Sequence, residues 1–275
     1  MNSTYNQLPI IMMIPSQPSQ KSVEIYNRLI KTPYDATEVI GQIEWQLQHQ
    51  LRNSRSDGNS AVALLQALNM QGKAEEAQNL ALDIWGIKHL LSEDAKPTFI
   101  YLLTGLGMFE KALQLGPEEL SAWNGNMLGP TLQAIGIGLG DLNILNAASN
   151  LVALNPKGSE QLSGFISSWS DIGLDKHFHQ QQATVHKVME GKFTEYSAIF
   201  QDAEADDIEL CVYYHVQGDR RKRRMLEEAI DDAIASFYDG IGGVDDPFYF
   251  TARLNYIVAD ITSKWPIKLD ATKPS

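Results

Sequence analysis

Three histidines lie close enough together in this 275-residue chain to suggest metal chemistry. His177, His179 and His186 carry imidazole rings, which are common zinc ligands. On a helix, His179 and His186 would share a face while His177 would point elsewhere, and no cysteine or suitably spaced acid completes the set. We therefore expect these histidines to lie on the polar surface of a helix, with no metal and no cofactor bound.

An acidic cluster offers a second candidate for metal chemistry. Asp206, Asp207 and Glu209 resemble part of the aspartate-rich metal motif of prenyl-chain enzymes. That motif has an acid at its fifth place, where Leu210 stands here, and the sequence shows no second motif of this kind. The pattern favours an acidic loop or a helix start. A helical enzyme with a site near residues 177–209 is the third function hypothesis.

A glycine pattern has part of the spacing that binds dinucleotide phosphates. It runs through Gly136, Gly138 and Gly140. Asp141 occupies the place of the last glycine, and no strand pattern precedes the segment. The pattern therefore indicates close helix packing or a helix end.

One dense basic run could contact nucleic acid or an acidic partner. It consists of Arg220, Arg221, Lys222, Arg223 and Arg224. Glu227 and Glu228 follow Arg223 and Arg224 at the spacing of ion pairs within one helix. We interpret the run as solvated helix surface, and a regulator that contacts nucleic acid or a nucleoprotein complex through it is the second function hypothesis.

Composition excludes several classes of protein. Apolar residues make up 44% of the chain, which is typical of a folded protein, and the net charge of −12 repels phosphate backbones but suits a partner with a basic face. The single cysteine, Cys211, excludes an internal disulfide and fits a reducing cytoplasm. The apolar stretch at residues 8–14 is too short for a membrane span and follows no basic residue, so no membrane partner is expected.

The elements that would position these side chains follow from apolar and glycine spacing. Ile40, Ile43, Leu47 and Leu51 share one face of a helix. Further along, Gly72, Gly107, Gly140 and Gly173 each separate two helix-like stretches, at spacings of 35, 33 and 33 residues. A period close to 34 residues is typical of a helix–turn–helix repeat.

The turn residues resemble the tetratricopeptide repeat over about residues 58 to 190. That family has a glycine closing its first helix, an aromatic or large apolar residue two places on, and alanine five places on; Gly107, Phe109 and Ala112 match all three. Gly72 and Gly140 match in part, and Gly173 matches poorly. Glycine permits the left-handed backbone of the turn, and the small alanine lets the second helix approach the first.

The resemblance implies a concave groove lined by the first helix of each pair. By the family register, small or polar side chains would face into that groove, where they could bond a bound segment. These side chains are Gln66, Asn69, Tyr101, Thr104, Ser167 and Ser170. The alternative is that other parts of the chain pack against these positions.

The last third of the chain allows two interpretations. Ile208, Leu210, Val212, Tyr214 and Val216 alternate as in a strand, whereas Leu210, Tyr213 and Tyr214 also share a helical face. We favour helices here, and a closing amphipathic helix that carries apolar residues from 254 to 265.

We expect an all-α fold: a right-handed array of antiparallel helix pairs, an α-solenoid similar to tetratricopeptide repeats, with an atypical C-terminal helical portion. Residues 1–20 would form an extended N-terminal arm, 21–200 the repeat array, 201–265 the C-terminal helical portion with an α+β alternative, and 266–275 a loose tail. The leading function hypothesis is a non-enzymatic cytoplasmic protein-interaction module, such as an adaptor, chaperone or immunity-type inhibitor. It would bind a protein partner in the groove, and its oligomeric state is open.

Overall fold

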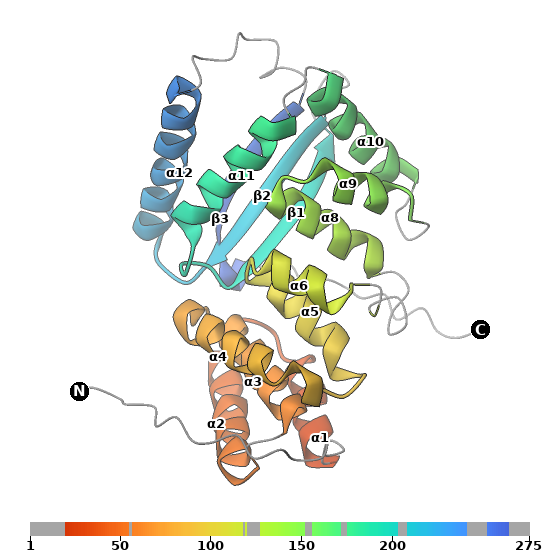
Figure 1. Cartoon of the computed structure of the whole chain (residues 1–275). Coiled ribbons are helices and arrows are strands. Elements are labelled where there is room, and N and C mark those ends of the chain that lie inside the picture. Colours follow the sequence, from red (N-terminus) through yellow and green to blue (C-terminus); the bar gives the residue numbers. More distant parts are fainter. Residues whose placement is uncertain are drawn as a thin grey trace.

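The computed structural model describes residues 20–54, 57–117, 119, 127–151, 156–171, 175–202, 208–240 and 252–263. The chain is mostly helical, with a three-stranded sheet in its C-terminal part (Figure 1). Several sequence predictions lie outside the described residues, among them the N-terminal arm, the C-terminal tail, Gly173, Asp206 and Asp207.

The helices that precede the sheet form antiparallel pairs. Helix α3 packs against α4, α5 against α6, and α8 against α9; α5 also contacts both α3 and α8. The bounds are α1 (Gln20–Leu29), α2 (Thr37–Asn53), α3 (Gly58–Met70), α4 (Ala74–Gly86), the 3-10 helix η1 (Lys88–Leu90), α5 (Ala95–Gly105), α6 (Phe109–Leu115), α8 (Leu128–Leu139), α9 (Leu142–Ser149), α10 (Pro156–Asp171) and α11 (Asp175–Met189).

Glycines with a left-handed backbone make the turns of these pairs, as the sequence predicts. Gly72, Gly107 and Gly140 have φ values of 69°, 75° and 63°, and they separate α3 from α4, α5 from α6, and α8 from α9. Phe109, two residues after Gly107, is buried, and its ring centroid lies 4.9 Å from that of Tyr196. The aromatic residue of the motif therefore closes the turn against the sheet.

The sheet corrects the expectation of an all-α fold. Strands β1 (Glu195–Asp202) and β2 (Ile208–Val216) pair antiparallel, and β3 (Ala252–Asp260) pairs with β2 in parallel. Helix α12 (Arg220–Gly240) connects β2 to β3, and the 3-10 helix η3 (Ile261–Ser263) follows. The helices expected across residues 208–217 and 254–265 are wrong over 208–216 and 254–260, which form β2 and β3. In addition, β1 begins within the segment assigned to the repeat array.

Tertiary pairing explains why the helical interpretation failed. The alternating residues Leu210, Val212 and Tyr214 lie in the middle strand, between two partners. In β3, Val258 is buried on one face while Ile257 is half-buried on the other. Apolar residues on both faces of a strand give spacings of three and four residues, which resemble helix periodicity in the sequence.

Helices cover one face of the sheet, as Figure 1 shows for α8, α10 and α11. On that face, Phe165 of α10 contacts Phe200 of β1 with ring centroids 5.7 Å apart, and it contacts Phe178 of α11 at 5.5 Å. On the opposite face, Ile199 is 51% exposed. The aromatic cluster fixes α10 and α11 against the sheet. None of the described helices combines the length and the apolar composition that a membrane crossing requires.

Candidate functional site

Four of the predicted groove residues face other parts of the same chain. Gln66 and Asn69 lie on α3, and Tyr101 and Thr104 lie on α5. Asn69 and Thr104 are only 4% and 5% exposed, and Gln66 and Tyr101 are half-buried. Thr104 donates its hydroxyl to the carbonyl oxygen of Ile100, at 3.0 Å, within its own helix.

Tyr34, from the connection between α1 and α2, occupies the space in front of these helices. Its side chain hydrogen bonds to Gln66, and its hydroxyl donates to Oε2 of Glu195 at 3.2 Å. Burial raises the pKa of Tyr34 and of Tyr101, so both hydroxyls stay protonated near neutral pH. The chain itself therefore fills this part of the predicted groove.

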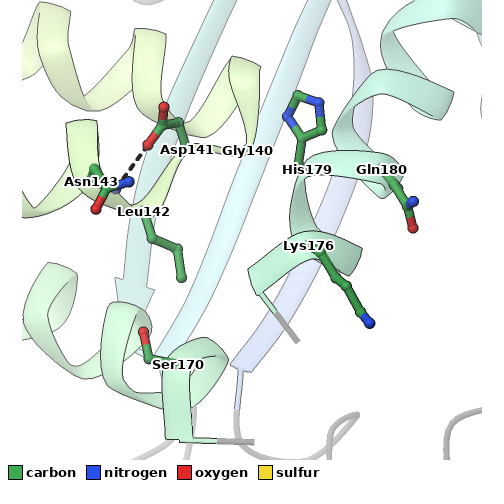
Figure 2. A pocket seen from close by; sticks show the side chains of 8 residues that line it. All are labelled: Gly140, Asp141, Leu142, Asn143, Ser170, Lys176, His179 and Gln180. Atoms are coloured by element: carbon green, nitrogen blue, oxygen red, sulfur yellow. Dashed lines mark hydrogen bonds between the residues drawn. The ribbon is translucent and has the colours of Figure 1, made fainter. Parts of the chain in front are cut away.

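The other two groove residues are exposed. Ser167 and Ser170 lie on α10, and Ser170 borders a cavity of about 570 Å³. The cavity is lined by Gly140, Asp141, Leu142, Asn143, Ser170, Lys176, His179 and Gln180. Figure 2 shows Lys176, His179 and Gln180 of α11 on one side, across from Ser170 and the α8–α9 turn.

Gly140 allows α11 to lie close to that turn. It ends α8 with a left-handed backbone, and a Cβ atom at this position would lie 2.5 Å from the Cα atom of His179. Asp141 then caps α9, because its Oδ1 accepts from the amides of Asn143 at 2.9 Å and Ile144 at 3.3 Å. Gly140 and Asp141 together thus form the part of the cavity wall that lies at the α8–α9 turn.

His179 presents a hydrogen-bond acceptor at this site. Its Nδ1 lies 2.6 Å from the carbonyl oxygen of Leu139. A carbonyl oxygen can only accept, so Nδ1 carries the proton and, in the neutral ring, Nε2 keeps its lone pair. The exposed side chains of Lys176, Gln180 and Ser170 add donors, so the cavity can pair with both donors and acceptors of a polar ligand.

Sequence reasoning found this site only in part. The sequence places Ser170 in a groove and singles out the Gly140-Asp141 pair and His179 for other reasons, but nothing in it joins these residues to one another in a single site or to Lys176. Their proximity depends on where α11 crosses the α8–α9 turn, and that crossing leaves no local signal in the sequence. The glycine motif that suggested a nucleotide site serves close packing instead: a Cβ atom on Gly138 would lie 2.2 Å from the Phe109 ring.

The other two histidines do not join His179. His177 is half-buried beside Phe237, with ring centroids 6.3 Å apart. His186 packs between Phe109 and Phe193, at 5.3 Å and 5.7 Å. The part of the chain that the structure describes contains no group of three or more histidine, cysteine, aspartate or glutamate side chains placed to hold a metal ion. The enzyme hypothesis stays a prediction, which elemental analysis of the purified protein would test.

The basic run is partly neutralised within the protein. Nη1 of Arg223 lies 2.5 Å from Oδ2 of Asp260, and Nε of Arg224 lies 2.9 Å from Oε1 of Glu228. The predicted pairing within the helix is thus confirmed for Arg224. Arg223 instead pairs with Asp260, the last residue of β3. Nζ of Lys222 donates to the carbonyl oxygen of Gln217 at 2.8 Å. Among the described residues of the run, Arg220 and Arg221 are exposed and form no ion pair or side-chain hydrogen bond with another described residue.

A scan against protein-family models, a search of curated proteins and a search of solved structures each found no match.

Proposed function

We propose that this protein is a non-enzymatic interaction protein of the cytoplasm that binds an exposed segment of a protein partner in the cavity between α9, α10 and α11. The observation that carries the proposal is the position of Ser170, a predicted groove residue that lies exposed beside Lys176, His179 and Gln180. A peptide backbone has one donor and one acceptor per residue, and the cavity offers both kinds of partner.

The arrangement of helix pairs supports the proposal. Stacked pairs of the kind formed by α3–α4, α5–α6 and α8–α9 present extended surfaces that suit protein partners. The net charge of −12 favours a partner with a basic face. An adaptor, a chaperone or an immunity-type inhibitor could bind such a partner. Because inner positions on α3 and α5 are packed by the chain, the proposed site lies at the other end of the array.

A capture experiment with matched variants tests the proposal. Tagged protein is incubated with lysate of the native source, half of it treated with nuclease, and retained proteins are identified by mass spectrometry. Ser170→Arg fills the cavity and adds a charge that repels a basic partner, whereas Ser163→Arg makes the same change at an exposed site on the same helix. A partner that survives nuclease, is lost with Ser170→Arg and is kept with Ser163→Arg supports the site. Equal retention by both variants rejects it.

The basic run at residues 220–224 supports a second candidate function, which is binding to nucleic acid. Arg220 and Arg221 are exposed and pair with no acid among the described residues, so they could contact nucleic acid. Retained proteins that disappear after nuclease treatment, with binding that weakens steeply as salt increases, would favour this alternative. Replacing residues 220–224 with alanine should then abolish binding, and unchanged binding would reject the alternative.

A further inference from the structure

Charges are segregated along α12 in an order that opposes the helix dipole. The helix begins with five basic residues, at 220–224, and its last turn contains no basic residue. Its acids, among them Glu228, Asp231 and Asp232, all follow the basic run. A helix N-terminus carries partial positive charge and a C-terminus partial negative charge, so this order disfavours the isolated helix. Such an order is expected where another surface interacts with the charges.

The segregated charges form one exposed stripe. At 3.6 residues per turn, Arg220, Arg221 and Arg224 lie on the same side of α12 as Glu228 and the acids that follow it. Between the two groups stands Met225, which is 60% exposed. The opposite side packs against α11 and β3, and Figure 1 shows α12 at the outer edge of the molecule.

The remaining charged residues near the start of the helix are Lys222, which is exposed, and Arg223 and Glu227, which are half-buried against the protein body. Arg223 pairs with Asp260, and the carboxylate of Glu227 accepts from the amide of Val258 at 3.3 Å. Lys222 bonds the Gln217 carbonyl. The body of the protein therefore satisfies these three side chains, while the stripe on the outer side faces solvent.

We propose that this stripe is the interface with a second copy of the chain, in which two α12 helices pack antiparallel about a two-fold axis near residue 226. In that arrangement Arg220 faces Asp232 of the second copy and Arg221 faces its Asp231. The reverse contacts form by symmetry, because an interface of this type uses the same patch on both copies. The two Met225 side chains meet near the axis, which gives an apolar centre and a charged rim.

The order of charges favours a second copy over a nucleic acid. A phosphate backbone would meet Glu228, Asp231 and Asp232 on the same side as the arginines, and these carboxylates repel it. A helix that is basic at one end and acidic at the other is complementary to its own reverse. The stripe shares no residue with the cavity, so this inference does not rest on the proposed function.

Sedimentation of the full chain tests the proposal. We expect a concentration-dependent dimer at about 0.1 M salt that dissociates at about 1 M, where the Debye length falls from about 10 Å to about 3 Å. Arg220→Glu with Arg221→Glu, and separately Asp231→Arg with Asp232→Arg, should each weaken self-association at least about tenfold, because opposite charges become like charges in symmetry-related pairs. Circular dichroism checks that both variants keep their helices.

Mixing the two variants gives the decisive result. In the mixture each reversed group of one variant meets an oppositely charged group of the other, so a heterodimer should form at low salt. Wild-type protein that is monomeric at all concentrations overturns the proposal. Dimers that ignore the reversals place the interface elsewhere, and variants that fail to associate when mixed reject the antiparallel pairing.

Discussion

The hydroxyl of Tyr34 donates a hydrogen bond to Oε2 of Glu195, 3.2 Å away and 161 residues further along the chain. Glu195 is the first residue of β1 and is 7% exposed, while Tyr34 belongs to the connection between α1 and α2. The bond joins the N-terminal helices to the sheet across the positions predicted for a groove. A surface that a repeat array would leave open is here an internal contact.

Removing this hydroxyl should destabilise the fold. Tyr34→Phe leaves a buried carboxylate with one donor fewer, and we expect the free energy of unfolding to fall by about 1–3 kcal/mol. Urea denaturation followed by circular dichroism measures the change. Tyr26→Phe is the matched comparison, because the Tyr26 hydroxyl lies 3.4 Å from Oγ1 of Thr98 and its longer contact should matter less. If both variants lose the same free energy of unfolding, the Tyr34 bond does not contribute more to stability than the Tyr26 contact.

Alanine at three glycines should separate backbone strain from steric conflict. Gly140→Ala combines a φ of 63° with a Cβ atom 2.5 Å from the His179 backbone, so we expect a loss of more than about 2 kcal/mol. Gly191→Ala has a φ of 71°, but its nearest contact is at 3.8 Å, so about 1–2 kcal/mol is expected.

At Gly41, substitution by alanine should have the opposite effect on stability. This glycine lies within α2, and a Cβ atom there meets nothing within 4 Å, so Gly41→Ala should stabilise the protein by about 0.5–1 kcal/mol. Thermal unfolding of the three variants gives the ranking. If Gly140→Ala and Gly191→Ala lose the same stability, α11 does not lie as close to the α8–α9 turn as described.

The ion pair of Lys73 with Glu44 should contribute more than an exposed pair. Both carboxylate oxygens of Glu44 lie 2.8 Å from Nζ of Lys73, and the Glu44 side chain is only 10% exposed. Lys73→Ala leaves this carboxylate with only the side-chain amides of Gln48 and Gln71 as donors, and a loss of about 1–3 kcal/mol is expected.

Lys96→Ala is the control for that pair. Its partners Glu93, at 2.9 Å, and Glu119, at 3.8 Å, are 84% and 36% exposed, so the loss should stay below about 1 kcal/mol. Denaturant titrations at low and high salt compare the two variants. A larger loss at Lys96, or no loss at Lys73, would contradict the ranking by burial.

Two histidines, buried His215 and half-buried His186, should make the protein less stable in mild acid. Burial lowers the pKa of His215 and of His186 below the usual 6.5, although Asp260 and Glu190 act in the opposite direction. Between the folded and unfolded pKa values the unfolded chain binds more protons, so stability rises with pH in that range. The contribution of these two histidines to stability is therefore fully present above about pH 6.5, and it is lost as the pH falls below that value.

Unfolding free energies measured between about pH 8 and about pH 5 test this dependence. His186→Asn and His215→Asn should each reduce the slope in that interval. His49→Asn, at an exposed position on α2, is the matched control. The expectation fails if the wild-type curve is flat or if the two variants keep the full wild-type slope.

The sequence predicts local features well where neighbouring residues decide them. The turns at Gly72, Gly107 and Gly140 were predictable because a left-handed backbone between two apolar periods needs glycine. The ion pair of Arg224 with Glu228 follows from their spacing on one helix. Both features arise within a few residues of chain, and both are present in the structure.

The sequence by itself thus determined where the helix pairs turn and which charges share a face, because these properties depend on backbone sterics and helix spacing. Only the tertiary structure decided that Ile208–Val216 and Ala252–Asp260 are strands, since parallel strands need a partner reached through α12. It also decided that Tyr34 and Glu195 meet across the part of the expected groove that lies at α3 and α5, and that Ser170 lies beside Lys176 and His179 at a cavity. These contacts join residues far apart in the chain, whose approach depends on the packing of whole elements and leaves no local pattern.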